Sequence, residues 1–329
     1  MKILIAGAGA VGCAFGGFLR KSGLDITMVG RGSHFDSIVQ KGLSISGIWG
    51  EHQVNGFAFG NDFASLKGPF DAILCCVKSF DTFSTAVAFR HLIGPQTIIV
   101  SMQNGLGNVE EIYRATECTR ILGGRVIFGI TRPEPAAINI TVYTEPVMIG
   151  FPVAWRPKVY TRNAELAQKL ADLIEASGIP CRYTEDIEKY QWAKFLYSSA
   201  LNPLSAINRV AYGELAEKAE WRKRMDNVIR EIFAVAAAKR IPLFWTRPED
   251  FMRVFYTKLV PDTARHRSSM LQDIEAGRRT EIESICGITV KYGEELSVPV
   301  PENKSLLIEV MKLKTPLAPL FSEQKRGDE

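Results

Sequence analysis

Short hydrophobic runs recur along the first half of the chain, separated by amphipathic stretches. The segments KILIA, LDITMVGR, FDAILCCVK, QTIIVSMQNG, RILGGRVIFG and VMIG are apolar over the length of a strand. Between them, CAFGGFLRKSG, NVEEIYRA and TRNAELAQKLADLIEASG have the spacing of helices. FDAILCCVK is apolar at successive positions, which is typical of a parallel strand buried on both faces. The pattern therefore predicts an α/β domain over residues 1–183, which IPCRYTED completes.

The pattern changes after residue 183, where strand-like runs stop. Long helical stretches follow in GELAEKAEWRKRMDNVIREIFAVAAAKR, HRSSMLQDIEAG, TEIESICGITVKYGEEL and NKSLLIEVMKLK. The last residues, SEQKRGDE, are polar and are expected to form a loose tail. The sequence thus predicts an all-α C-terminal domain over residues 184–329.

The first predicted strand leads directly into three glycines with the spacing G-x-G-x-x-G. Gly7 permits a tight turn, Gly9 lets the backbone approach a pyrophosphate, and Gly12 allows the following helix to pack closely on the strand. The start of that helix offers N–H groups to the phosphate. Because this motif lies between a strand and a helix, it predicts a Rossmann-type dinucleotide-binding domain.

The end of the second predicted strand indicates which dinucleotide is bound. An acidic residue at this point usually binds the ribose 2′-hydroxyl of NAD, but the strand ends here in Gly30 and Arg31. A guanidinium suits the 2′-phosphate of NADPH, although Arg31 could equally be a solvated loop residue. Lys78 and Asn104 follow two further strands, so they are expected to line the ligand crevice unless they are ordinary loop residues.

The segment Tyr190–Leu204 predicts a helix that is apolar on most sides. Lys194, Ser198 and Asn202 follow one another at spacings of four and form a narrow polar stripe on it. Such a stripe is either the solvated side of an amphipathic helix or a row of functional groups. Pro203 should kink this helix beside Asn202, or else end it.

A second candidate helix start lies in RRTEIE. Thr280 and Glu283 have the spacing of a capping box, which would place Glu281 in the first turn of the helix. Ser269, in RSSMLQD, is either a binding residue or simple helix filler.

Composition narrows the class of protein. The chain has 40 basic and 36 acidic residues, a net charge of +4 that is too small to indicate a nucleic-acid or membrane partner. The six cysteines form no C-x-x-C pair and the four histidines are far apart, so neither a disulfide framework nor a metal site is expected. The apolar start resembles a signal peptide, but its five glycines fit the dinucleotide motif better, which predicts a cytoplasmic protein.

Together these segments resemble the ketopantoate reductase (2-dehydropantoate 2-reductase) family over nearly the whole chain. The resemblance rests on GAGAVG, VKSFD, QNGLGN, WAKFLYSSALNPLSAI, SSMLQDIEAGRRTEIESICG and VPVPENKSL. It implies that Lys194 donates the proton and that Glu281 is the second catalytic residue, at the active-site cleft. The implied cofactor-binding residues are Gly7, Gly9, Gly12, Arg31, Lys78 and Asn104. The implied substrate-binding residues are Asn104, Ser198, Asn202 and Ser269.

The resemblance implies NADPH-dependent reduction of ketopantoate to pantoate, in the biosynthesis of pantothenate and coenzyme A. Lys194, in a partly dry cleft, is expected to have a lowered pKa and so to donate a proton readily. Many family members have asparagine where this chain has Ser198 and Tyr212. Another 2-oxo acid is therefore an alternative substrate, and a non-catalytic NADP(H)-sensing regulator is an alternative function. A homodimer is one option for the assembly.

Overall fold

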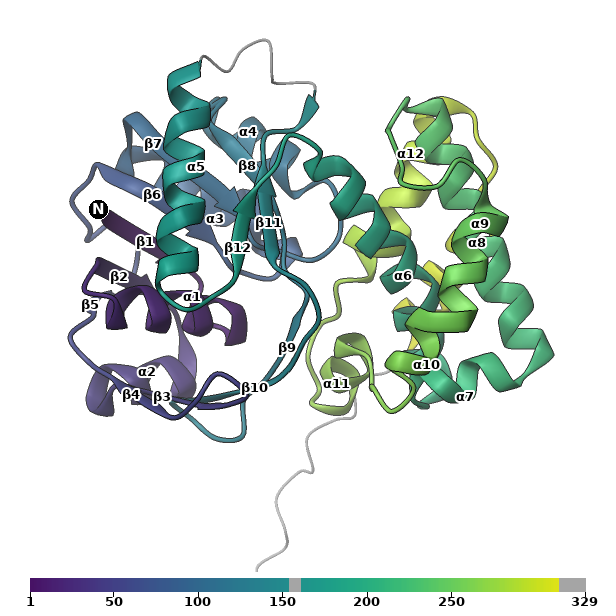
Figure 1. Cartoon of the computed structure of the whole chain (residues 1–329), viewed down its shortest axis with the longest axis horizontal. Coiled ribbons are helices and arrows are strands. Elements are labelled where there is room, and N and C mark those ends of the chain that lie inside the picture. The colour runs from purple at the N-terminus through teal and green to yellow at the C-terminus, as the bar shows by residue number, and fades with distance from the viewer. Residues whose placement is uncertain (154–160, 314–329) are drawn as a thin grey trace, which may run out of the picture. The chain divides into compact units, whose positions relative to one another are not determined.

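The computed structural model describes residues 1–153 and 161–313. It consists of two compact units, Met1–Lys194 (unit 1) and Phe195–Glu329 (unit 2), which Figure 1 shows. The division comes after Lys194 rather than after residue 183, because the first turns of the long helix that follows belong to unit 1. The predicted polar tail lies outside the described residues.

Unit 1 is built on a sheet that, within the described residues, has eight strands. Their order across the sheet is β12-β11-β8-β7-β6-β1-β2-β5, and β11 runs antiparallel to β8 while the other neighbouring pairs are parallel. The chain passes from β1 outward on both sides, so β1 and β6 flank the point at which the strand order reverses. The strands are β1 (Lys2–Ala6), β2 (Asp25–Val29), β5 (Ala58–Gly60), β6 (Phe70–Cys75), β7 (Ile93–Ser101), β8 (Ile121–Arg125), β11 (Val147–Gly150) and β12 (Cys181–Tyr183).

Alternate side chains of the central strands belong to two separate hydrophobic cores. Ile3 and Ile5 of β1 pack in one core with Phe15 and Ile174, whereas Leu4 packs in the other with Phe89 and Ile112. Both faces are therefore covered by helices, which explains why these strands are apolar at successive positions. The helices are α1 (Ala10–Lys21), α2 (Gly32–Lys41), α3 (Thr82–Phe89), α4 (Asn108–Thr116) and α5 (Thr161–Ala176), with short 3₁₀ turns η1 (Ser79–Asp81) and η2 (Arg90–Leu92).

Unit 1 also contains a second sheet that the sequence pattern did not reveal. Its order is β4-β3-β10-β9, with β3 (Leu43–Gly47), β4 (His52–Val54), β9 (Phe128–Thr131) and β10 (Ala137–Tyr143). RILGGRVIFG was predicted as a single strand, and this was wrong. The segment divides after Arg125 into β8 of the first sheet and β9 of the second. The second sheet packs its apolar side chains on α1, where Leu43 and Ile45 crowd the position of Gly17.

The described part of unit 2, residues 195–313, contains helices and no strand, which confirms the predicted all-α domain. The predicted long helix GELAEKAEWRKRMDNVIREIFAVAAAKR is broken at Lys218. The helices are α6 (Ile187–Asn208), which begins in unit 1, α7 (Tyr212–Glu217), α8 (Ala219–Ala238), α9 (Pro248–Val254), α10 (Val260–Asp262), α11 (Ser269–Glu275), α12 (Ile288–Leu296) and α13 (Pro301–Lys312), with π-helical turns η4 (Phe255–Leu259) and η5 (Glu283–Gly287).

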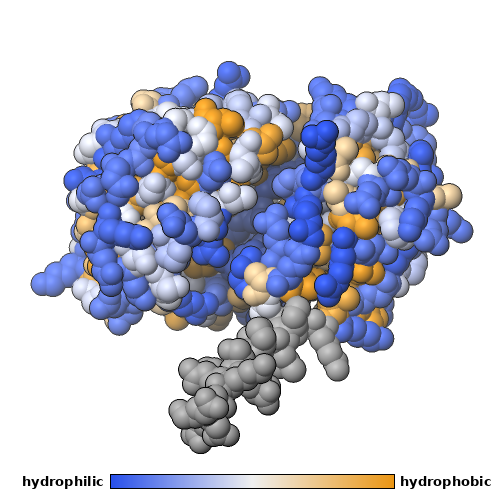
Figure 2. Space-filling view, turned by 90° about the horizontal axis from the view of Figure 1, so that it is seen from below, coloured by the Kyte–Doolittle hydropathy of each residue, from blue (hydrophilic) through white to orange (hydrophobic). Residues whose placement is uncertain are grey.

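Helix α6 continues five residues beyond Pro203, so this proline does not end it. The ring removes the N–H that would bond the carbonyl oxygen of Ser199, and the predicted kink there stays a prediction. Hydrophilic residues dominate the surface seen in Figure 2, and hydrophobic residues occur there in small groups. This agrees with a chain whose apolar side chains are gathered mainly in its cores.

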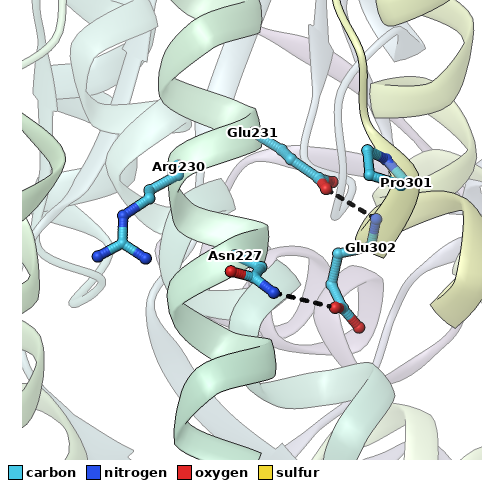
Figure 3. Close-up of a pocket in the computed structure, with 5 residues that line it drawn as sticks. All are labelled: Asn227, Arg230, Glu231, Pro301 and Glu302. Atoms are coloured by element: carbon cyan, nitrogen blue, oxygen red, sulfur yellow. Dashed lines mark hydrogen bonds between the residues drawn. The ribbon is translucent and has the colours of Figure 1, made fainter.

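A carboxylate from α8 holds the start of α13. Glu231 accepts hydrogen bonds from the backbone N–H groups of Glu302 (2.7 Å) and Asn303 (2.9 Å) and from the side-chain amide of Asn303 (2.7 Å). These backbone groups belong to the first turn of α13, where no acceptor exists within the helix. Figure 3 shows the Glu231 carboxylate directed at Glu302, beside a pocket of about 390 Å³. The carboxylate therefore joins α8 to α13.

Replacing Glu231 by alanine should lower the free energy of unfolding of unit 2 by about 1.5–3 kcal/mol, because hydrogen bonds to a charged acceptor are lost. Urea unfolding, together with hydrogen exchange of the α13 amides, measures the effect. Arg230→Ala is the matched control, since the Arg230 side chain is 52% exposed and only approaches Glu249 at 3.9 Å. Equal destabilisation by the two substitutions would contradict this role for Glu231.

Candidate active site

The turn between β1 and α1 is shaped by its three glycines. Gly7 has φ +109°, and a Cβ there would lie 2.8 Å from the backbone nitrogen of Val77. A Cβ on Gly12 would lie 1.9 Å from the carbonyl oxygen of Gly7, so only glycine allows α1 to pack so close to β1. A Cβ on Gly9 would meet no atom within 4 Å. The turn is thus closed at Gly7 and Gly12 and open at Gly9, which fits the approach of a phosphate group.

The loops that follow β1, β6 and β7 lie at the same edge of the parallel sheet. Gly7 follows β1 and donates its N–H to the carbonyl oxygen of Val29 at 2.9 Å. Lys78 follows β6 and immediately precedes η1, and Asn104 follows β7. Because β1 and β6 flank the point of reversal, these residues stand where open α/β sheets bind their ligands.

Lys194 is fixed at this edge by two oxygen acceptors. Its Nζ donates to the Asn104 side-chain oxygen at 2.7 Å and to the Val126 carbonyl oxygen at 2.7 Å. Asn104 follows β7 and Val126 follows β8, so the half-buried ammonium connects α6 to two strand ends. At Lys194, the polar stripe on α6 is therefore bound to protein oxygens and is not simply a face exposed to solvent. The structure brings together two residues, Lys194 and Asn104, that are 90 positions apart in the sequence.

Asn104 is itself supported by a network that the sequence did not reveal. The side-chain amide of Asn108, at the start of α4, donates to the Asn104 carbonyl oxygen at 2.9 Å. The Thr82 hydroxyl donates to the side-chain oxygen of Asn108 at 3.0 Å, and Gln103 donates to that hydroxyl at 2.7 Å. All three supporting side chains are buried. The only signal in the sequence was the recurrence of amides in QNGLGN, which did not identify their partners.

Arg31 lies at the end of β2 and carries an ion pair that was not predicted. Its guanidinium donates to the Asp81 carboxylate at 2.8 Å, and its side chain is 86% exposed. Asp81 belongs to η1, three residues after Lys78. The guanidinium is therefore accessible to a phosphate, but a phosphate that binds it must share it with Asp81.

In unit 2, Asn202 is buried and bound through its side-chain oxygen. The Tyr212 hydroxyl donates to this oxygen at 2.5 Å, and the Ser268 hydroxyl donates to the backbone oxygen of Asn202 at 3.4 Å. Ser268 also accepts from the N–H of Leu271 and so caps α11. Ser269, the predicted binding residue, is exposed at the first position of that helix.

Ser198 has a partner on its own helix, and one predicted feature near Glu281 differs in the structure. Ser198 donates its hydroxyl to the Phe195 carbonyl oxygen at 3.3 Å and is thus engaged with its own helix. The predicted capping box at Thr280 was wrong, because helical backbone begins at Ile282 and the Glu283 carboxylate pairs with Arg279. Glu281 therefore lies just before the helix rather than in its first turn, and it is 7% exposed.

The pocket of Figure 3 contains none of the predicted site residues. It is lined by Asn227, Arg230, Glu231, Pro301 and Glu302.

Among the described residues, no group of three or more His, Cys, Asp or Glu side chains is placed to hold a metal ion. Within the same part of the chain, no helix has the length and apolar character needed to cross a membrane.

Comparison with protein families gives two matches that together span most of the chain. The model described as ketopantoate reductase PanE/ApbA matches residues 3–151, and the model of the C-terminal part of the same family matches residues 186–314. The chain belongs to the ketopantoate reductase family. The predicted family membership and the predicted order of an α/β domain before a helical one are thus confirmed.

Two curated relatives match along nearly their whole length. A 2-dehydropantoate 2-reductase of Aquifex aeolicus is 36% identical over 306 residues, which are 92% of this chain and 94% of that protein. A 2-dehydropantoate 2-reductase of Pyrococcus horikoshii is 32% identical over 312 residues, with the same shares covered.

Solved structures show the same fold. A PanE/ApbA family ketopantoate reductase of Ralstonia eutropha superimposes with a TM-score of 0.83 at 29% identity, covering 95% of this chain and 98% of that one. A D-mandelate dehydrogenase, solved with NADH and anilino(oxo)acetate, superimposes with a TM-score of 0.82 at 24% identity and the same coverage. At that identity, the second likeness concerns the fold alone.

The open space at Gly9 and the crowding at Gly12 predict opposite outcomes for one added methyl group. Gly9→Ala should leave the melting temperature near that of the wild type and weaken dinucleotide binding, because its Cβ meets only the space that a phosphate would occupy. Gly12→Ala should lower the melting temperature markedly, since its Cβ would overlap the Gly7 carbonyl oxygen. Thermal unfolding and cofactor titration of both variants test this. A clear loss of stability in Gly9→Ala, or none in Gly12→Ala, contradicts it.

Proposed function

We propose that this ketopantoate reductase family member reduces 2-dehydropantoate to pantoate with NADPH, a step in pantothenate biosynthesis. Curated relatives at 30–36% identity over most of the chain carry the name of this activity. The observation that carries the proposal is the ammonium of Lys194, held at 2.7 Å from both Asn104 and Val126 at the ligand-binding edge of the sheet. This arrangement supports the assignment of Lys194 as the proton donor, because a dinucleotide fold binds its ligand at this edge.

The reaction requires a hydride at the ketone carbon and a proton at its oxygen. NADPH, when bound, supplies the hydride. Lys194 supplies the proton, so that the carbonyl becomes a hydroxyl, and the amine is reprotonated from water. The oxygens of Asn104 and Val126 hold the ammonium in one position, so its proton need not be oriented anew at each turnover.

The polar side chains of unit 2 are assigned to the substrate. Asn202 and Ser269 bind the carboxylate, since an amide N–H and a hydroxyl both donate hydrogen bonds. Glu281 accepts a hydrogen bond from the substrate hydroxyl. On the cofactor side, the turn of Gly7, Gly9 and Gly12 is assigned to the pyrophosphate, and Arg31 and Lys78 are assigned to the 2′-phosphate.

The experiment that tests the function is NADPH oxidation, followed by absorbance, against a panel of 2-oxo acids. We expect 2-dehydropantoate to have the highest kcat/KM. If a larger 2-oxo acid has the highest kcat/KM instead, that acid is the substrate. Ser198 and Tyr212 are the residues that raise this alternative. Cofactor binding without oxidation by any 2-oxo acid would instead identify a sensor of NADP(H).

Lys194→Met keeps an unbranched side chain of similar stem volume and removes the ammonium group that would donate the proton. The variant should bind NADPH normally and lose turnover by about 10²–10⁴-fold, the range of general acid catalysis. Lys189→Met is the matched control on the same helix, because Lys189 pairs with Asp186 and is not assigned to the site. Steady-state kinetics from pH 6 to 9 measure both variants. The assignment fails if Lys194→Met keeps most of its kcat.

The cofactor preference is tested through Arg31 and its partner. The wild type should bind NADPH at least about tenfold more tightly than NADH, and Arg31→Ala should remove most of that difference because a charge-assisted contact with phosphate is lost. Asp81→Asn should strengthen NADPH binding by up to about fivefold, since the exposed ion pair competes with the phosphate. Fluorescence titration of both cofactors measures these effects. Equal affinities in the wild type would rule out the assignment of Arg31.

A further inference from the structure

Tyr212 and Asn202 are both buried, with exposures of 3% and 7%, and they are joined by a hydrogen bond. The Tyr212 hydroxyl at the start of α7 donates to the side-chain oxygen of Asn202 at 2.5 Å. We propose that Tyr212 is a positioning residue, which directs the amide NH₂ of Asn202 toward the carboxylate of the 2-oxo acid. The inference rests on the proposed function and adds the residue that sets how this substrate group is recognised.

The geometry of the contact sets the direction of the hydrogen bond, since the Tyr212 hydroxyl donates to the side-chain oxygen of Asn202. Burial raises the pKa of Tyr212 well above its ordinary value, so the phenol keeps the proton that it donates. Asn202 thus presents its oxygen to Tyr212. Because the amide is planar, its NH₂ group points away from the phenol, with two N–H donors. Among the described residues, no acceptor bonds this NH₂ group.

The donors left on Asn202 select the chemistry of the ligand group. A carboxylate has only acceptors, so it matches the NH₂ group of an amide whose oxygen is turned toward Tyr212. A ligand group on the NH₂ side of Asn202 meets donors there, because the oxygen faces the phenol. The orientation therefore favours the acid end of a 2-oxo acid.

Both partners are held in place by further contacts. The Tyr212 ring lies edge-on to the ring of Tyr197 at 5.8 Å and lies 5.1 Å from the ring of His266. Its backbone N–H donates to the carbonyl oxygen of His266 at 3.0 Å. The Ser268 hydroxyl holds the backbone of Asn202 at 3.4 Å. Rotation of the Tyr212 ring would break its ring contacts, and rotation of the Asn202 amide would break its hydrogen bond with Tyr212, so the amide is preorganised.

The neighbouring polar positions offer no side-chain amide of their own. The Ser198 hydroxyl is bound to the Phe195 carbonyl oxygen, and the Tyr212 side chain has no N–H. Among Ser198, Asn202 and Tyr212, the amide belongs to Asn202, and the Tyr212 hydroxyl is bound to its oxygen.

Tyr212→Phe tests the inference by removing the hydroxyl and keeping the ring. KM for 2-dehydropantoate should rise about three- to tenfold, the range of one neutral hydrogen bond, with kcat changed less than about twofold. Tyr197→Phe is the matched control, because it removes another hydroxyl of the same ring cluster, one bonded to Thr263 rather than to Asn202. Its KM should equal that of the wild type.

A second comparison separates positioning from general stability. In an Asn202→Ala background, Tyr212→Phe should raise KM no further, because the group it positions is absent. An equal KM in Tyr212→Phe and wild type, the same rise in Tyr197→Phe, or an additive rise in the double variant would each overturn the inference.

The proposed function can fail separately, and wild-type turnover reveals this. If the wild type reduces no 2-oxo acid, the proposed function and the carboxylate assignment fail together. The side-chain amide resonance of ¹⁵N-labelled Asn202 then tests the positioning without substrate. This resonance should shift in Tyr212→Phe and stay unchanged in Tyr197→Phe. An unshifted resonance in Tyr212→Phe would contradict a set orientation.

Discussion

The ammonium of Lys194 is the group on which the site depends. A cation that is half withdrawn from water must find acceptors, because leaving it without them costs several kcal/mol. Both acceptors come from loops at the carboxyl ends of strands, Asn104 after β7 and Val126 after β8. These two bonds join the first turns of α6 to the sheet. Ser198 and Asn202 follow on the same helix, one and two turns beyond Lys194.

The order of strands and helices could be predicted where a strand is covered on both sides. FDAILCCVK and QTIIVSMQNG are apolar throughout because β6 and β7 lie between two cores, and no other element type explains such short runs as well. The second sheet was not predicted, because its strands lack such apolar runs. Its strands are short, one face is polar, and β3 pairs with β10, which lies about ninety residues further along the chain. Local pattern carries little information about such a pairing.

In the candidate site, too, the local sequence could not predict contacts between residues that are far apart in the chain. Lys194 was recognisable because one charge on a narrow stripe of an apolar helix is unusual. Its partner Asn104 could be placed only at the edge of the sheet, since the contact joins residues 90 positions apart. The pair Ser268 and Ser269 was ambiguous for a different reason. Adjacent serines look alike in sequence, but the start of α11 buries the first as a cap and exposes the second. The predicted capping box was wrong because helical backbone begins at Ile282, and the Glu283 carboxylate pairs with Arg279.

Tyr212 shows how a buried hydroxyl can set the orientation of a neighbouring amide. An asparagine at this position would offer donors of its own to a ligand. The tyrosine offers no donor to a ligand, because its hydroxyl donates to Asn202. That hydrogen bond opposes a flip of the Asn202 amide. An amide that can flip presents its oxygen to a carboxylate for part of the time, and that orientation is repulsive. An amide whose orientation is already fixed in the folded protein loses no rotational freedom when the ligand binds. One fixed pair of N–H donors can therefore bind a ligand as well as a larger number of mobile donors. Such an arrangement suits a ligand with one firmly recognised acidic end and places fewer constraints on the remainder of the molecule.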